Sequence, residues 1–160
     1  MQTLDVLTHC RLFSQFSQPQ LQRILPLCAW KDVADGAMLF RQGQPARHLY
    51  VVAQGRATLD LTLQRSDGSP CSPPATVAVV CCGEPFGWSA VMEPHVMTLS
   101  ARATGPSSFV LLDGPQLKGL LQHEPDLGHP FMTALAQLLS DRLMQTREVL
   151  LYERGLAVPA

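Results

Sequence analysis

The chain has 160 residues, which is enough for one domain with a substantial core; its apolar fraction of 46% is ordinary for a globular protein and its charged fraction of 16% is low. The formal net charge of -1 provides no basic surface for nucleic acid. Asp5 and His9 lie within the first ten residues, which contain no long apolar run, so a signal peptide is not expected. No later apolar segment approaches the length of a membrane span. We therefore expect a cytoplasmic protein with a single domain over residues 1–160 and no direct contact with nucleic acid or membranes.

The five cysteines form no metal-binding pattern. They are odd in number and lack metal-type spacing: Cys10, Cys28, Cys71, Cys81 and Cys82. The adjacent pair is expected to lie on an apolar strand with the two side chains on opposite faces. In a cytosolic protein, reduced cysteines that serve as small apolar residues are the default interpretation.

The first predicted element is a helix that begins after Ser17. Ser17 is a suitable N-cap, and Pro19 suits the first helical turn. Apolar residues then recur at helical spacing, at Leu21, Ile24, Leu25 and Cys28.

From Trp30 onward the hydrophobic period changes from helix to strand. Short strands are predicted at 31–33, 38–40, 48–53 and 56–63, separated by glycine-containing turns. The polar, Pro/Ser-rich segment 64–75 is expected to be a solvated loop. Strands this short at such regular spacing predict an all-β sandwich or jelly roll, with the roll over about residues 30–112.

A glycine-rich turn between two strands is the main candidate site. A strand is predicted at 76–82 and another at 98–104, and Gly83 and Gly87 precede a possible helical turn at 88–92. Glycines ahead of a helical turn allow backbone N–H groups to converge on one point, where the helix N-terminus favours negative charge. The segment therefore predicts a site for an anion.

The end of the chain is predicted to be helical, with a short helix from Pro115 and a long one between Phe131 and Leu151, so that helices occupy about residues 115–153. The long helix carries a seam at heptad spacing, formed by Met132, Ala136, Leu139, Leu143, Thr146 and Leu150. Leu135 and Leu138 broaden this stripe toward the roll. A second apolar face predicts a partner helix, and we expect a homodimer through it.

Two motifs resemble the cyclic nucleotide-binding domain family. The run from Gly36 to Ala57 reads G-x-x-L-F-x-Q-G-x-P-A-x-x-L-Y-V-V-x-x-G-x-A, and its Gly43 and Gly55 stand where tight hairpins tolerate positive φ. The glycine-rich turn resembles the family's phosphate-binding cassette, F-G-E-[LI]-[AG] followed by R-[STA]-A. The resemblance implies a mainly β fold with flanking helices: a double-stranded β-helix (jelly roll) with an N-terminal helix and a long C-terminal helix.

The cassette departs from the family pattern at its two most diagnostic positions. Trp88 stands where the family has the glutamate that binds the ribose 2′-hydroxyl, and Met97 stands where it has the arginine that pairs with the cyclic phosphate. A thioether cannot pair with a phosphate, and loss of a charge partner costs about 2 to 5 kcal/mol of binding. The backbone N–H groups of Gly87 and Ala90 and the Thr98 hydroxyl remain as donors. The ligand is expected to be cAMP or cGMP bound weakly, or another small anion.

The resemblance also implicates the long helix, where the motif R-L-x-x-T is formed by Arg142, Leu143 and Thr146. Thr146 can meet a ligand or a symmetry mate, or can instead bond to its own helix backbone. The candidate ligand-binding residues are Phe86, Gly87, Trp88, Ser89, Ala90, Met97, Thr98, Ser100, Thr146 and Arg147. Arg102 is interpreted as a solvated strand residue.

Two functional hypotheses follow from these residues. The first is a regulatory sensor with a small anionic or nucleotide-like ligand; the second is a ligand-free interaction module in which the Trp88 indole fills the pocket. An enzyme is not expected, because the histidines are scattered and show no metal-binding or catalytic arrangement. No DNA-binding domain is expected either, because only RGLAVPA follows Glu153, so any output would pass to a separate protein effector.

Overall fold

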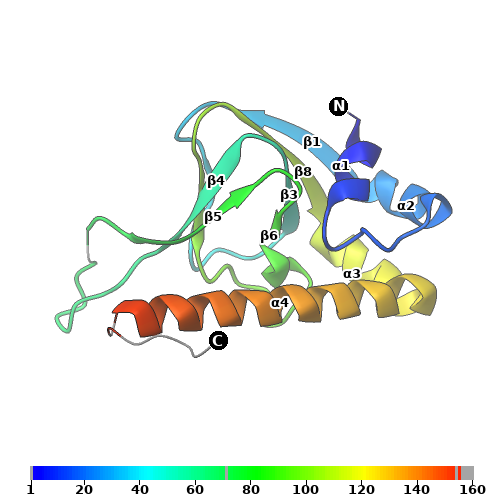
Figure 1. The fold of residues 1–160 in the computed structure, drawn as a ribbon. Coiled ribbons are helices and arrows are strands. Elements are labelled where there is room, and N and C mark those ends of the chain that lie inside the picture. The colour runs from blue at the N-terminus through cyan, green and yellow to red at the C-terminus, as the bar shows by residue number, and fades with distance from the viewer. Residues whose placement is uncertain (1, 71, 154, 156–160) are drawn as a thin grey trace.

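The computed structural model of the protein describes residues 2–70, 72–153 and 155. A β-roll packs against two short N-terminal helices, and a long C-terminal helix runs along one side of the molecule (Figure 1). The strands are β1 (Cys28–Val33), β2 (Met38–Phe40), β3 (His48–Gln54), β4 (Arg56–Leu61), β5 (Ala75–Cys81), β6 (Pro85–Phe86), β7 (Ser100–Ala103) and β8 (Ser107–Asp113). The helices are α1 (Thr3–His9), α2 (Gln18–Ile24), η1 (Leu25–Leu27), η2 (Trp88–Ala90), α3 (Gly114–His123) and α4 (Pro125–Glu153).

The strands form two four-stranded antiparallel sheets, in the orders β1-β8-β3-β6 and β2-β7-β4-β5. Apart from β4 and β5, strands that are neighbours in a sheet are not consecutive in the chain, as β1 and β8 show, so the chain winds around the roll. This arrangement confirms the predicted jelly roll with flanking helices. Because β5 has a paired neighbour on one side only, it forms an edge of the second sheet.

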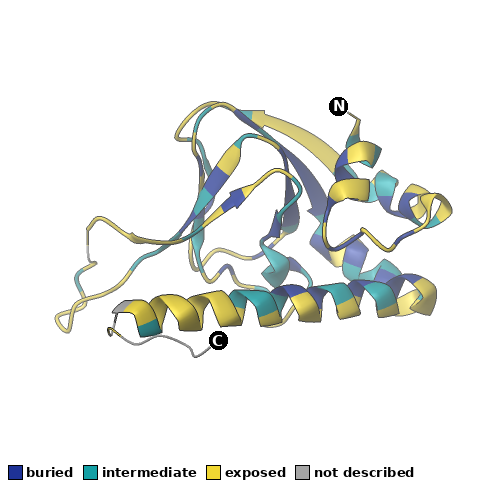
Figure 2. Ribbon diagram, in the orientation of Figure 1, coloured by how far each residue is buried: buried dark blue, intermediate teal, exposed yellow. Residues whose placement is uncertain are grey.

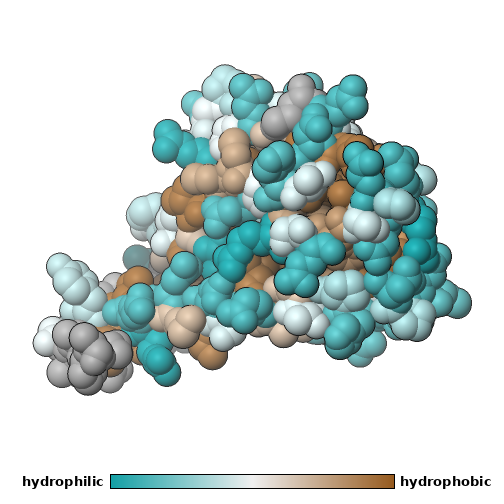
Figure 3. Space-filling view, turned by 45° about the vertical axis from the view of Figure 1, so that its right-hand side comes forward, coloured by the Kyte–Doolittle hydropathy of each residue, from teal (hydrophilic) through white to brown (hydrophobic). Residues whose placement is uncertain are grey.

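Strand β3 separates two apolar cores. Leu49 and Val51 point toward the helices, and Tyr50 and Val52 point into the roll, because successive side chains of a strand alternate between its faces. The helix-side core includes α1, α2, α3 and the first half of α4, whereas the roll core lies between the sheets. Figure 2 shows that buried residues recur along the first half of α4, whereas its end is mostly exposed. The space-filling view shows apolar surface in patches among polar side chains (Figure 3).

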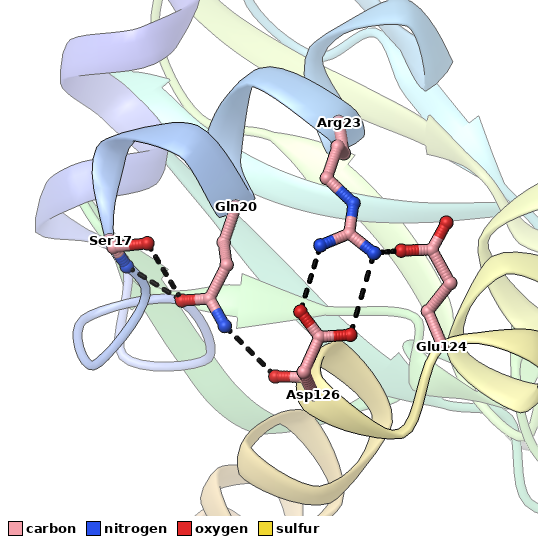
Figure 4. A network of polar contacts seen from close by, with 5 residues as sticks. All are labelled: Ser17, Gln20, Arg23, Glu124 and Asp126. Atoms are coloured by element: carbon pink, nitrogen blue, oxygen red, sulfur yellow. Dashed lines mark hydrogen bonds and ion pairs between the residues drawn. The ribbon is translucent and has the colours of Figure 1, made fainter.

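A polar network joins α2 to the start of α4 (Figure 4). Ser17 and Gln20 form the capping box of α2, and Arg23 pairs with Glu124 and with Asp126, whose Oδ2 lies 2.8 Å from Nη1. Pro130 lies inside α4 and has no N–H to donate to the Asp126 carbonyl four residues earlier. The Gln20 Nε2 group donates to that carbonyl instead, at 2.9 Å, so α2 compensates for the proline and allows α4 to begin at Pro125.

Several boundaries differ from the sequence-based expectations. Helix α1 and the two-residue strand β6 were not predicted. Cys28 begins β1 rather than continuing the helix, because the LPL segment forms a 3₁₀ turn. Cys82 lies in a turn beyond β5. The strand expected at 98–104 begins only at Ser100, because Met97 exchanges backbone hydrogen bonds with the turn before β3.

Within the described ranges, no helix combines the length and apolar character that crossing a bilayer requires.

Candidate functional site

A cavity of about 670 Å³ opens between the edge strand β5 and helix α4. We call it the β5–α4 cavity. On the sheet side it is lined by Phe40, Leu59 and residues 75–79 of β5. The glycine turn and the loop before β7 contribute Gly87, Trp88, Ser89, Met97, Thr98 and Leu99. Helix α4 closes the remaining side with Arg142, Gln145, Thr146 and Val149.

Gly87 adopts a conformation that only glycine takes readily. Its φ is 76°, and a Cβ at this position would lie 3.2 Å from the His48 carbonyl oxygen and 3.2 Å from Tyr50 Cδ2. The turn then continues as η2, in which the Ala90 N–H donates to the Gly87 carbonyl at 3.1 Å. The expectation that Ala90 supplies a free backbone donor is therefore wrong, because that N–H is already used within the turn.

The two residues that depart from the family pattern both line the cavity without closing it. Met97 is 3% exposed and packs in the roll core, whereas Trp88 is half-buried and packs against the helix-side core. The indole thus packs partly against the helix-side core and partly lines the cavity, and space remains open beside Gly87. Neither side chain carries a charge with which to neutralise an anion.

Arg142 provides the positive charge that the cassette lacks. It is the one charged side chain among the described residues that line the cavity. Its Nη2 atom is buried and has no hydrogen-bond partner in the described part of the chain. Glu84 Oε1 lies 3.6 Å away, within ion-pair range but beyond a hydrogen bond, while Glu84 Oε2 accepts from the Cys81 N–H at 2.7 Å. A residue of the cavity lining thus carries a guanidinium with unused hydrogen-bonding capacity.

Arg142 belongs to the R-L-x-x-T motif but is not among the ligand-binding residues predicted from the sequence. Thr146 follows four residues later, so the two side chains share a face of α4, and that spacing was the available signal. The Thr146 hydroxyl donates to the Arg142 carbonyl at 2.8 Å, which confirms the alternative in which Thr146 bonds to its own helix backbone. Thr146 nevertheless lies in the cavity lining.

The structure brings together Gly87, Trp88, Ser89, Met97, Thr98 and Thr146 at this cavity. The other candidates lie outside its lining. Phe86 and Ala90 are buried in the roll core, and Phe86 stacks on Tyr50 with ring centroids 5.1 Å apart. The Ser100 hydroxyl accepts from the Gln42 N–H at 2.9 Å, and Arg147 is exposed on α4. Arg102 is exposed, as expected for a solvated strand residue.

His95 supports the glycine turn from behind. It has a positive φ of 57°, and Lys118 Nζ donates to its Nε2 at 3.0 Å. The opposite ring nitrogen, Nδ1, is then free to donate to the Ser89 carbonyl, which lies 3.1 Å away. A histidine held between α3 and the turn in this way has a structural role.

None of the described cysteines, histidines or acidic residues lines the cavity. Among the described residues, no group of three or more histidine, cysteine or acidic side chains is placed to hold a metal ion. Cys10 is buried and Cys28 half-buried, and burial raises the pKa of each thiol to about 12. Cys81 and Cys82 are exposed, so their expected role as apolar packing residues is wrong, while Cys71 lies outside the described residues.

Comparison with known proteins places this geometry in context. The model of the cyclic nucleotide-binding domain family matches residues 30–124. The fold is similar to a candidate cyclic nucleotide-binding protein from Geobacter metallireducens GS-15, with 26% identity, a TM-score of 0.74, and coverage of 89% of this chain and 99% of that chain. A cyclic nucleotide-binding domain from Methylobacillus flagellatus KT shares the fold at 22% identity, with a TM-score of 0.77 and coverage of 94% and 81%.

A curated relative is a candidate potassium channel protein of Rhodopseudomonas palustris. It is 25% identical over 116 residues, which is 72% of this chain. The matched region is 26% of the length of that relative. The similarity therefore concerns one domain of the relative and not the whole protein.

Proposed function

The chain belongs to the cyclic nucleotide-binding domain family, and from this premise we propose that it is a non-enzymatic regulatory sensor. Its ligand is a small anion or a nucleotide-like molecule, bound in the β5–α4 cavity. Its affinity for cAMP and cGMP is reduced or lost, because Trp88 and Met97 replace the residues with which the family pattern holds the ribose and the phosphate. Ligand binding in the cavity changes how α4 packs against the roll.

The observation that carries this proposal is that the glycine turn and α4 line the same cavity. A ligand there contacts Trp88 and Ser89 on one side and Arg142 and Thr146 on the other. Any change in how α4 packs on the roll therefore changes ligand affinity, and ligand binding changes that packing by the same free energy. The open space beside Gly87 supports ligand binding over the alternative of a pocket filled by the Trp88 indole.

The experiment is calorimetric titration with cAMP and with cGMP. We expect no binding at micromolar concentrations by the wild type, and binding by the double variant Trp88→Glu/Met97→Arg, because Met97 lines the cavity and an arginine there reaches the ligand space. Trp88→Phe/Met97→Leu is the matched control, because it changes the same positions without adding a charge. Thermal unfolding confirms that each variant is folded.

Micromolar binding of either nucleotide by the wild type would contradict the proposed loss of affinity. Failure of the folded Glu/Arg variant to bind would contradict the proposal that the β5–α4 cavity is the ligand site.

A second observation favours self-association through α4. The apolar side chains of Met132, Leu143 and Leu150 are 52%, 70% and 49% exposed, and they lie on the face that was predicted as a helix seam. Two other seam positions are used within the protein, since Leu139 packs against the helix-side core and Thr146 lines the cavity. We propose that the exposed residues pair with the same face of a second copy, so that ligand binding and assembly are linked through one helix.

Light scattering coupled to size-exclusion chromatography tests this proposal. The wild type should elute with the mass of a dimer, and Leu143→Ser/Leu150→Ser should shift it to a monomer. Leu63→Ser is the control, because Leu63 is a 48% exposed leucine in the loop after β4 and is not part of α4. A wild type that is monomeric at tens of micromolar would refute the pairing.

A further inference from the structure

We infer that the ligand of the β5–α4 cavity has an apolar body and one anionic group, and that Arg142 rather than the glycine turn binds the anionic group. This inference rests on the proposed function and specifies its ligand class. Aromatic and branched aliphatic carboxylates or sulfonates belong to this class.

The anionic group is assigned from the charge of the cavity. Arg142 is the one charged residue among its described lining residues, and its buried Nη2 lacks a hydrogen-bond partner there. A buried donor without an acceptor is destabilising, and a guanidinium forms its strongest hydrogen bonds with an anionic oxygen. A ligand with one carboxylate or sulfonate supplies that acceptor, whereas a second negative charge would find no further cation in this lining.

The apolar body is assigned from the walls. Phe40, Leu59 and Ala78 lie on the sheet side, Leu99 lies in the loop before β7, and Val149 lies on α4. Val149 is 59% exposed, so a ligand that covers it removes apolar surface from water. The volume of about 670 Å³ is within the usual range of small-molecule sites, which is about 300 to 1,000 Å³.

The glycine turn is a poor alternative for the anionic group. Its helical segment, Trp88–Ala90, has only three residues, and the Ala90 N–H is already bonded to the Gly87 carbonyl. Met97 offers a thioether where a cation would be needed. The turn therefore contributes shape and the apolar face of Trp88, and the positive charge comes from α4.

Glu84 competes with the ligand for Arg142. Its carboxylate is held by the Cys81 N–H at 2.7 Å and lies 3.6 Å from Nη2, so it partly neutralises the guanidinium in the unliganded protein. A ligand anion that approaches to hydrogen-bond distance draws Arg142 away from Glu84. This exchange loosens a contact between α4 and the end of β5, which gives the route by which binding reaches the helix.

The test uses two fluorescent probes that differ in charge. Anilinonaphthalene sulfonate has an aromatic body and one sulfonate, and phenylnaphthylamine is its uncharged counterpart. Both are titrated against the wild type, Arg142→Gln, Glu84→Gln and the control Arg56→Gln, which removes an exposed arginine of β4 outside the cavity lining. The neutral probe reports whether the apolar walls are intact in each variant.

We expect Arg142→Gln to weaken sulfonate binding about 10- to 100-fold while phenylnaphthylamine binding stays within about 2-fold. Glu84→Gln should tighten sulfonate binding about 2- to 5-fold, because it removes the competing carboxylate. Arg56→Gln should change neither probe. Equal effects of Arg142→Gln on the two probes, or sulfonate binding that does not depend on Arg142, would overturn the assignment.

The nucleotide titration tests the proposed function, and the probe titration tests the ligand class, so their negative results can be told apart. If the probes bind without regard to Arg142, the sensor proposal stands and only the ligand class is wrong. If the wild type binds neither probe, both the cavity and the ligand class are refuted.

Discussion

Replacement of Gly87 by alanine tests the geometry of the glycine turn. Two effects should add. The first is the left-handed backbone, since a Cβ at φ 76° costs about 1 to 2 kcal/mol. The second is crowding, since the new Cβ would lie 3.2 Å from the His48 carbonyl oxygen and 3.2 Å from Tyr50 Cδ2, and overpacking of this kind typically costs about 1 to 3 kcal/mol. We therefore expect the free energy of unfolding to fall by about 2 to 5 kcal/mol.

Gly43→Ala separates these two effects. Gly43 has a φ of 84°, but a Cβ there meets no atom within 4 Å, so only the backbone contribution of about 1 to 2 kcal/mol should appear. Urea unfolding followed by circular dichroism measures both variants. If Gly87→Ala destabilised the protein no more than Gly43→Ala does, the close approach of the turn to β3 would be refuted.

Three further predictions concern the rest of the domain. Cys10 and Cys28 should resist an aromatic disulfide reagent at about pH 8, because burial raises the pKa of each thiol to about 12. The exposed Cys81 and Cys82 should react. Mass spectrometry of the labelled peptides distinguishes the two pairs. The hydrogen bond from Arg23 holds the pKa of Asp126 below the ordinary aspartate value of about 4. The unfolded chain therefore takes up this proton at a higher pH than the folded protein does, so the stabilisation is present above about pH 4 and is lost as the pH falls further. Between about pH 6 and pH 3, the urea midpoint of Asp126→Asn should therefore fall less than that of the wild type. Gly128→Ala should lower the free energy of unfolding, because the new Cβ would collide with a backbone carbonyl of α3. Gly119→Ala is the control: Gly119 is also helical but a Cβ there meets nothing within 4 Å, so the free energy of unfolding should rise by about 0.5 to 1 kcal/mol.

The roll was predictable because its constraints are local. Turns that need a residue with positive φ are marked by glycine, and Gly43 and Gly55 have φ values of 84° and 81° in the structure. The hairpins expected at both positions are nevertheless wrong, because each turn connects strands of different sheets. The alternation of apolar and polar residues predicted most of the longer strands. The short strand β6 escaped prediction, because two residues carry no periodicity and its pairing with β3 depends on the folded roll.

The candidate site was predictable only in part, since its composition depends on how α4 packs. Helical spacing places Arg142 and Thr146 on one face of α4, but it does not tell whether that face meets the roll, a second copy or water. The same limit applies to Phe86 and Ala90. Both belong to a recognisable motif, yet the packing of the turn buries them in the roll core and away from the cavity.

We propose that the glycine turn and α4 line one shared cavity, in which Arg142 binds the anionic group of the ligand. Nitrogen-15 spectra recorded during titration with anilinonaphthalene sulfonate test it most directly, by following the backbone amides of Gly87 and Ser89 and the Nε–H of Arg142. We predict that these three signals shift together along a single binding curve. Shifts confined to the amides around Met132 and Leu143, on the exposed face of α4, with the Gly87 and Arg142 signals unchanged, would contradict the account.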